Sequence, residues 1–155
     1  HVGADNMSRA TQVISSGFVI GLGYSGVLAV CFLVFRVELL EVFASPGQDF
    51  SAIRDIGAQM MLGMSCYVLA DAVILVCSGT LRGAGDTRWL MNASITIHVG
   101  MLLVQLLVIL VLEQGALVSW WVFVSTLVLN AIIFAGRLFA GHWRRPEQLA
   151  RVMAH

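Results

Sequence analysis

An aspartate and a tyrosine four residues apart are the pair in this sequence best suited to chemistry. Asp71 lies in the apolar run MLGMSCYVLADAVILVCSG, and Tyr67 precedes it. On a helix, residues at this spacing share a face. A carboxylate and a phenol offer oxygen ligands to a hard cation such as sodium. Burial disfavours a charged carboxyl, so this acid could also take up and release a proton.

The depth of Asp71 makes this chemistry a hypothesis about ion coupling. Asp71 precedes Gly79 by roughly 12 Å of helix, close to the middle of a hydrocarbon layer about 30 Å thick. Inserting an acid there costs about 2.5 to 3.5 kcal/mol, and acids at such positions generally serve a function. We expect Asp71 and Tyr67 to bind the coupling ion, sodium or a proton. The alternative is a neutral Asp71 hydrogen-bonded to a neighbouring helix.

The composition requires a membrane around this acid. Of 155 residues, 59% are hydrophobic and 12% charged, whereas soluble domains carry about 25% charged residues. Four runs are long enough to cross a bilayer, at roughly 16–35, 56–78, 89–112 and 116–140. Alternating polarity is absent, which argues against a barrel. The predicted fold class is therefore an all-α integral membrane protein, in which Glu113-Gln114-Gly115 joins the last two helices as an antiparallel hairpin.

The arginines predict the orientation of these spans. All nine basic residues are arginine, and four spans place seven of them on one side with both chain ends. Only Arg36 and Arg54 fall on the other side, with the segment 37–55. Short arginine-rich loops stay in the cytoplasm. We expect a multi-pass protein of the plasma (inner) membrane with both ends cytoplasmic. The seven are Arg9, Arg82, Arg88, Arg137, Arg144, Arg145 and Arg151.

Small and polar residues indicate how the helices pack. The first span carries Gly17, Gly21, Ser25 and Ala29, spaced so that another helix can approach closely. The fourth span carries a polar stripe, and His98 and Gln105 share a face of the third. We expect hydrogen bonds between helices from both sets, rather than a substrate path. The stripe comprises Ser119, Thr126, Asn130 and Arg137.

Other functions find little support in the sequence. The net formal charge is zero, which gives no bulk attraction to nucleic acid. Cys31, Cys66 and Cys77 all lie in apolar runs without metal-ligand spacing. No arrangement of nucleophile and base in a polar setting suggests an enzyme, and no cofactor is expected beyond the coupling ion.

The stretch GTLRGAGDTR, residues 79–88, is the most distinctive polar motif. It lacks the lysine of a phosphate-binding loop and follows no strand. Its glycines allow a tight reversal, and Asp86 or Thr87 can cap the third helix. Arg82 and Arg88 can mark the cytoplasmic boundary or pair with acids, which would make the loop an ion-paired latch between helix pairs. The motif residues are Gly79, Arg82, Gly83, Gly85, Asp86, Thr87 and Arg88.

This motif, placed after a membrane helix, resembles the signature loop of the multidrug and toxic compound extrusion (MATE) family. The opening VGADNMSRA, the segment FASPGQDFSAI and the ending RLFAGHWRR resemble other family patterns in the same order, although the usual glutamine is absent from the first. Members have twelve helices in two lobes. The resemblance implies that residues 1–155 are a partial membrane domain, the last four helices of the C-terminal lobe, cut from a longer protein or truncated.

The resemblance also implies a role for the buried acid. In the NorM-like, sodium-driven branch, the tenth helix carries a tyrosine and an aspartate one turn apart ahead of this loop. Tyr67 and Asp71 match that spacing, and a glutamate from a helix outside this chain would join them around the cation.

The function expected from the resemblance is secondary active multidrug efflux. Sodium- or proton-coupled antiport would export cationic or amphipathic compounds, with the remaining helices of a full-length transporter as partners in the bilayer. One alternative is a lipid-linked saccharide flippase of the same superfamily, which the absence of cationic residues from the membrane cores disfavours. Another is a small non-transporting membrane subunit.

Overall fold

The computed structural model describes residues 7–42 and 51–141. Several sequence features lie outside the described residues. These are the first residues of the opening motif, the Pro46-Gly47 pair, and the basic tail with Arg144, Arg145 and Arg151.

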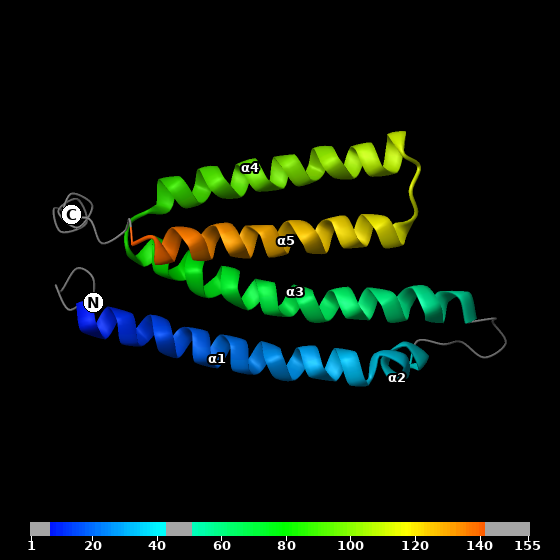
Figure 1. Ribbon diagram of the computed structural model, residues 1–155, viewed down its shortest axis with the longest axis horizontal. Coiled ribbons are helices and arrows are strands. Elements are labelled where there is room, and N and C mark those ends of the chain that lie inside the picture. The colour runs from blue at the N-terminus through cyan, green and yellow to red at the C-terminus, as the bar shows by residue number, and fades with distance from the viewer. Residues whose placement is uncertain (1–6, 43–50, 142–155) are drawn as a thin grey trace.

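Four long helices dominate the described part of the chain (Figure 1). They are α1 (Met7–Val34), α3 (Ser51–Gly83), α4 (Thr87–Leu106) and α5 (Ala116–Phe139). Their candidate membrane spans, by length and hydropathy, are Arg9–Val34, Arg54–Gly83, Thr87–Val111 and Ala116–Phe139. The predicted all-α membrane fold with four spans is confirmed, and each helix contains most of its predicted apolar run.

Two short elements were not predicted. A six-residue helix, α2 (Arg36–Glu41), follows α1. The third span does not stay α-helical to residue 112, because a π-helical turn, η1 (Leu107–Val111), closes it. The hairpin after η1 is confirmed: Gln114 N–H donates to the Val108 carbonyl at 3.0 Å, and α5 begins directly after Gly115.

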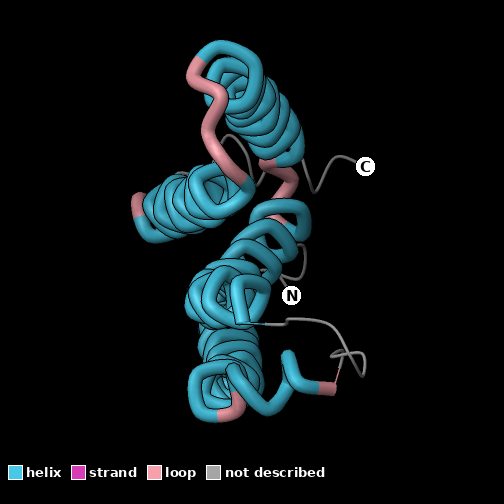
Figure 2. The backbone as a smooth tube through the Cα atoms, turned by 90° about the vertical axis from the view of Figure 1, so that its right-hand side faces the viewer, coloured by secondary structure: helices cyan, strands magenta, loops and turns pink. Residues whose placement is uncertain are grey.

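The helices form an open row rather than a closed ring. In Figure 1 the order across the row is α1, α3, α5, α4, and the end-on view of Figure 2 agrees. The closest pairs are α1 with α3, α3 with α5, and α4 with α5. The helices α3 and α5 run in the same direction, whereas α4 is antiparallel to both. We call the end with Ala84–Asp86 the loop end and the end with Leu112–Gly115 the hairpin end.

The small residues of α1 pack against α3, as predicted. Ser25 and Ala29 are buried, and the Ser65 hydroxyl of α3 donates to the Ala29 carbonyl at 3.2 Å. A Cβ added at Gly17 or Gly21 would lie 3.5 Å from Val76, in ordinary contact. The close approach of α1 and α3 is thus built from side chains of small volume.

The glycine-rich motif is more helical than a loop prediction implies. The helix α3 continues through Gly83, and α4 begins at Thr87, so only Ala84, Gly85 and Asp86 make the turn. The reversal depends on Gly85, whose φ of 79° is left-handed. The prediction that several glycines form the reversal was wrong, because the other two take helical conformations.

The described core lies at the loop end. Its buried members come from α3, the turn, α4 and α5, and they include no residue of α1. The three helices α3, α4 and α5 therefore converge where the chain reverses, and this convergence positions the polar groups described next. The members are Cys77, Leu81, Ala84, Leu90, Phe134 and Leu138.

Candidate functional site

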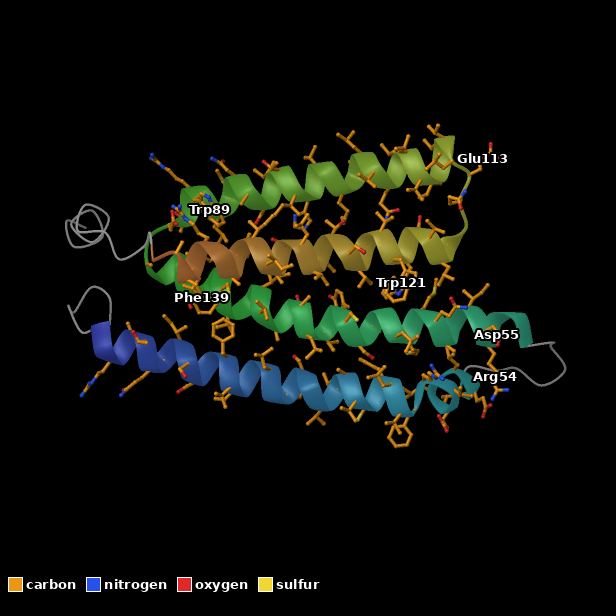
Figure 3. All side chains as sticks on the ribbon, in the orientation of Figure 1. Arg54, Asp55, Trp89, Glu113, Trp121 and Phe139 are labelled. Carbon is orange, nitrogen blue, oxygen red and sulfur yellow. The ribbon has the colours of Figure 1, made fainter. Side chains whose placement is uncertain are left out.

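Asp71 lies within α3, twelve residues before its last residue, Gly83. Its side chain is partly exposed, while its neighbours Ala70 and Ala72 are both buried. Within the described spans, it is the one formally charged residue away from a helix end. Figure 3 shows the labelled charged residues Arg54, Asp55 and Glu113 at the hairpin end. The local setting is therefore a carboxyl group isolated among apolar and small residues.

The position of the Tyr67 side chain is set by packing against α5 and not by a hydrogen bond to Asp71. Its ring stacks on Phe123 of α5, with centroids 6.1 Å apart and an interplanar angle of 19°. Within the described residues, no hydrogen bond joins the Tyr67 hydroxyl to Asp71, and Asp71 has no polar partner. The two residues are a turn apart on one helix, but the structure does not bring their oxygens into contact.

These residues supply part of a cation site. A carboxylate and a phenol oxygen have the chemistry that sodium prefers, but two oxygens are fewer than a hard cation normally takes. Among the described residues, no group of three or more His, Cys, Asp or Glu is placed to hold a metal ion. If a cation binds at Asp71, further oxygen ligands must come from groups beyond this pair.

The strongest polar contact lies at the loop end, between Asp86 and Arg137. The Arg137 Nε–H donates to Asp86 Oδ2 at 2.8 Å, and the two side chains are 20% and 6% exposed. The guanidinium also lies over the Trp89 ring, 4.9 Å from its centroid, and that ring contacts Phe134. This pair ties the turn after α3 to the last turn of α5 across 51 residues of chain.

The ion pair corrects the predicted role of Asp86. Asp86 does occupy the N-cap position of α4, but its side chain makes no capping hydrogen bond. A charged donor offers a stronger bond than a backbone N–H, and Arg137 lies within reach of the carboxylate. The sequence left open an ion-paired latch formed by Arg82 and Arg88, but the ion pair found at the loop joins Asp86 to Arg137 instead. Arg82 and Arg88 are exposed and form no ion pair within the described residues.

Some of the other predicted polar contacts join two helices, and others stay within one helix. Gln105 and Ser119 bond between helices: the Ser119 hydroxyl donates to Gln105 Oε1 at 3.0 Å, and Gln105 Nε2 donates to the Ser119 carbonyl at 2.8 Å. His98 and Thr126 instead bond to carbonyls of their own helices, so the prediction was wrong for these two. Asn130 is buried, and within the described residues its Oδ1 has no hydrogen-bond partner.

Sequence reasoning missed the aromatic contacts between α3 and α5. The Trp120 Nε1–H donates to the Met60 carbonyl at 3.1 Å, and the Tyr67 ring of α3 stacks on Phe123 of α5 with centroids 6.1 Å apart. Met60 and Trp120 lie 60 positions apart along the chain. Within one helix, the aromatic residues look like ordinary apolar residues, so no local signal could have indicated the contact.

Comparison with known proteins identifies the family. The family model MatE matches residues 1–111, which include α1, α3 and α4. A probable multidrug resistance protein NorM of Pasteurella multocida is 31% identical over 87 residues, covering 56% of this chain and 18% of that protein. The multidrug resistance protein MdtK of Proteus mirabilis is 30% identical over 87 residues, covering 56% and 19%.

The matched segment spans about a fifth of the length of these relatives. No solved structure matches the chain significantly. The match over residues 1–111, the four apolar helices and the motif at the turn after α3 agree with one another. The chain belongs to the MatE family, the multidrug and toxic compound extrusion proteins.

Proposed function

We propose that this chain acts within a larger transporter that exports cationic or amphipathic compounds by secondary active antiport. Family membership supports transport, and both relatives bear the name of multidrug resistance proteins. Transporters of this general kind move helical units about a site near the bilayer midplane. The open row of helices leaves faces of α1, α3 and α4 for further helices to cover.

The observation that carries the proposal is Asp71. An isolated carboxyl deep in a membrane helix has an energetic cost, and binding a proton or sodium ion offsets that cost. An ion drives transport only when it binds one conformation better than another. Asp71 has no polar partner within the described residues. A proton or sodium ion that binds it in one conformation would therefore neutralise a carboxylate charge that nothing else compensates there. Tyr67 is the second proposed ligand, and the choice between sodium and proton is left to experiment.

The proposed orientation places the loop end in the cytoplasm of a cell with the protein in its plasma (inner) membrane. Arg82, Arg88 and Arg137 lie at the loop end, whereas Arg36 in α2 and Arg54 near the start of α3 lie at the opposite end. This asymmetry supports a cytoplasmic loop end. We propose no enzymatic activity and no cofactor for the chain.

Efflux by the full-length protein tests the coupling proposal. Asp71→Asn keeps the size of the side chain but removes its charge and its ability to exchange a proton. We expect export driven by separate sodium and pH gradients to fall by at least about tenfold under the gradient that supplies the coupling ion. Glu113→Gln is the matched control, because Glu113 is an exposed acid outside the helices. Export that survives Asp71→Asn unchanged under both gradients would contradict the proposal.

A further inference from the structure

An open pocket of about 420 Å³ lies where α2 meets the start of α3, at the hairpin end of the molecule (Figure 1). Its charged lining residues are Arg36 of α2 and Arg54 and Asp55 of α3, the latter two labelled in Figure 3. The wall is completed by Val37, Ala58, Gln59 and Leu62. None of these residues belongs to the proposed ion site or to the ion pair at the loop end, so the pocket is a separate feature of the molecule.

Two contacts hold the short helix α2 against α3. A Cβ added at Gly57 would lie 2.8 Å from Leu40 Cδ2, so the leucine side chain occupies space that only a glycine leaves free. Arg54 Nη2 lies 3.4 Å from Glu41 Oε1, although these side chains are half exposed and such a pair is weak by itself. Together the contacts place charged side chains of α2 and α3 around one pocket.

Two of the charged groups in the pocket have no partner. Within the described residues, Arg36 and Asp55 form no ion pair or hydrogen bond, whereas Arg54 is paired with Glu41. If Arg54 and Glu41 are counted together, the pocket presents one cation and one anion and has a net charge of zero. A complementary ligand therefore carries one negative and one positive group.

The pocket lies at the boundary of the apolar layer. The span Arg9–Val34 ends two residues before Arg36, and the span Arg54–Gly83 begins with Arg54. Lipid headgroups occupy this boundary, and arginine side chains reach toward it. The residues just before Arg36 offer an exposed apolar surface on which acyl chains can lie. They are Leu33, Val34 and Phe35. The position of the pocket therefore favours a lipid over a ligand dissolved in water.

We propose that this pocket binds the headgroup of phosphatidylethanolamine, with the phosphate on Arg36 and the ammonium on Asp55. A guanidinium donates two parallel N–H groups to phosphate oxygens, and a primary ammonium donates N–H groups to a carboxylate. The headgroup carries one charge of each sign, as the pocket does. Phosphatidylglycerol has the same phosphate but no cation for Asp55. This lipid site does not depend on the proposed ion coupling.

Lipid binding to the purified full-length protein tests the assignment. Dioleoyl phosphatidylethanolamine and dioleoyl phosphatidylglycerol are titrated separately in detergent, and native mass spectrometry gives the dissociation constant of each. Arg36→Gln should weaken binding of both lipids about fivefold, because both carry the phosphate. Asp55→Asn should weaken binding of phosphatidylethanolamine alone, because only that headgroup carries an ammonium. Glu38→Gln is the matched control, since Glu38 is an exposed acid on α2 that does not line the pocket.

Three results would overturn the lipid site. Unchanged phosphatidylethanolamine affinity in both Arg36→Gln and Asp55→Asn is expected if another segment of the protein covers the pocket. An equal loss of both lipids in Asp55→Asn would mean that the carboxylate does not recognise the ammonium. Soluble glycerophosphoethanolamine should not displace the lipid at equal concentration. Displacement by this compound would assign the pocket to a free phosphate ester instead of a membrane lipid.

Discussion

At the loop end, α3, α4 and α5 close around a partly buried ion pair, whereas at the hairpin end the same three helices line an open groove of about 600 Å³. The loop end joins its helices through opposite charges and a shared apolar core. The hairpin end joins them through neutral hydrogen bonds and aromatic rings. The residues of the loop end fix its three helices to one another, while those of the hairpin end leave an open groove between them.

The contrast follows from the side chains available at each end. Asp86 and Arg137 lie where the chain reverses and where α5 finishes, so both backbones are already close. At the hairpin end, the Trp120 indole lies between α5 and α3, where it packs against Gly63 and donates to the Met60 carbonyl. Large rings between helices leave spaces that small core residues do not.

The largest effect is expected from breaking the ion pair at the loop end. Asp86→Asn leaves the Arg137 cation without its anionic partner and should lower the free energy of unfolding by about 3 kcal/mol. Detergent-induced unfolding of the full-length protein measures this. A double-mutant cycle with Arg137→Gln should show strong coupling between the two sites. Arg82→Gln, an exposed arginine at the same end, is the control. Additive effects in the cycle would show that the pair does not clamp this end.

A smaller effect is expected from adding one methyl group under Trp120. Gly63→Ala places a Cβ where the indole nitrogen lies, so α3 and α5 must separate. Overpacking of this kind costs about 1 to 3 kcal/mol, and we expect about 2 kcal/mol in the same unfolding measurement. Gly100→Ala in α4 is the matched control, because open space surrounds that position within the described residues. Equal stability of the two variants would mean that the Trp120 indole is not tightly packed against Gly63.

The smallest effect is expected from the neutral hydrogen bonds at the hairpin end. Ser119→Ala removes the hydroxyl that donates to Gln105 and should cost about 0.6 kcal/mol, the average for such bonds in membrane proteins. Its coupling to Gln105→Ala in a double-mutant cycle is the measurement. Thr126→Ala is the control, since that hydroxyl bonds within its own helix. A coupling energy between Ser119 and Gln105 as large as that between Asp86 and Arg137 would contradict the expected difference in strength between the two ends.

The sequence predicts the helices well because length and hydropathy alone decide them. The four apolar runs became the four spans, and the small residues of α1 meet α3 as expected. Extensions beyond the predicted runs occur where polar residues continue a helix past the membrane boundary, as Arg54 and Arg82 do in α3. A hydropathy argument cannot detect such extensions.

The contacts between distant segments could not be predicted in the same way. The partner of Asp86 is an arginine 51 residues later, and its choice depends on how α5 packs beside α3. The packing of the Trp120 indole likewise depends on the helix register that places Gly63 opposite it. Asp71 and Tyr67 were identifiable from spacing alone because both lie on one helix, and their role as ion ligands stays a prediction.

The left-handed residue of the turn makes the three glycines of the signature motif unequal. At position 85 any other residue would meet a conformational penalty of about 1 to 2 kcal/mol, whereas Gly79 and Gly83 are helical with open space around them in the described chain. Evolutionary drift should therefore be freer at 79 and 83, where alanine fits the backbone, unless another part of the protein needs close approach there. A glycine retained at those two positions across the family would mark a helix–helix contact, while one retained at 85 needs only the turn itself.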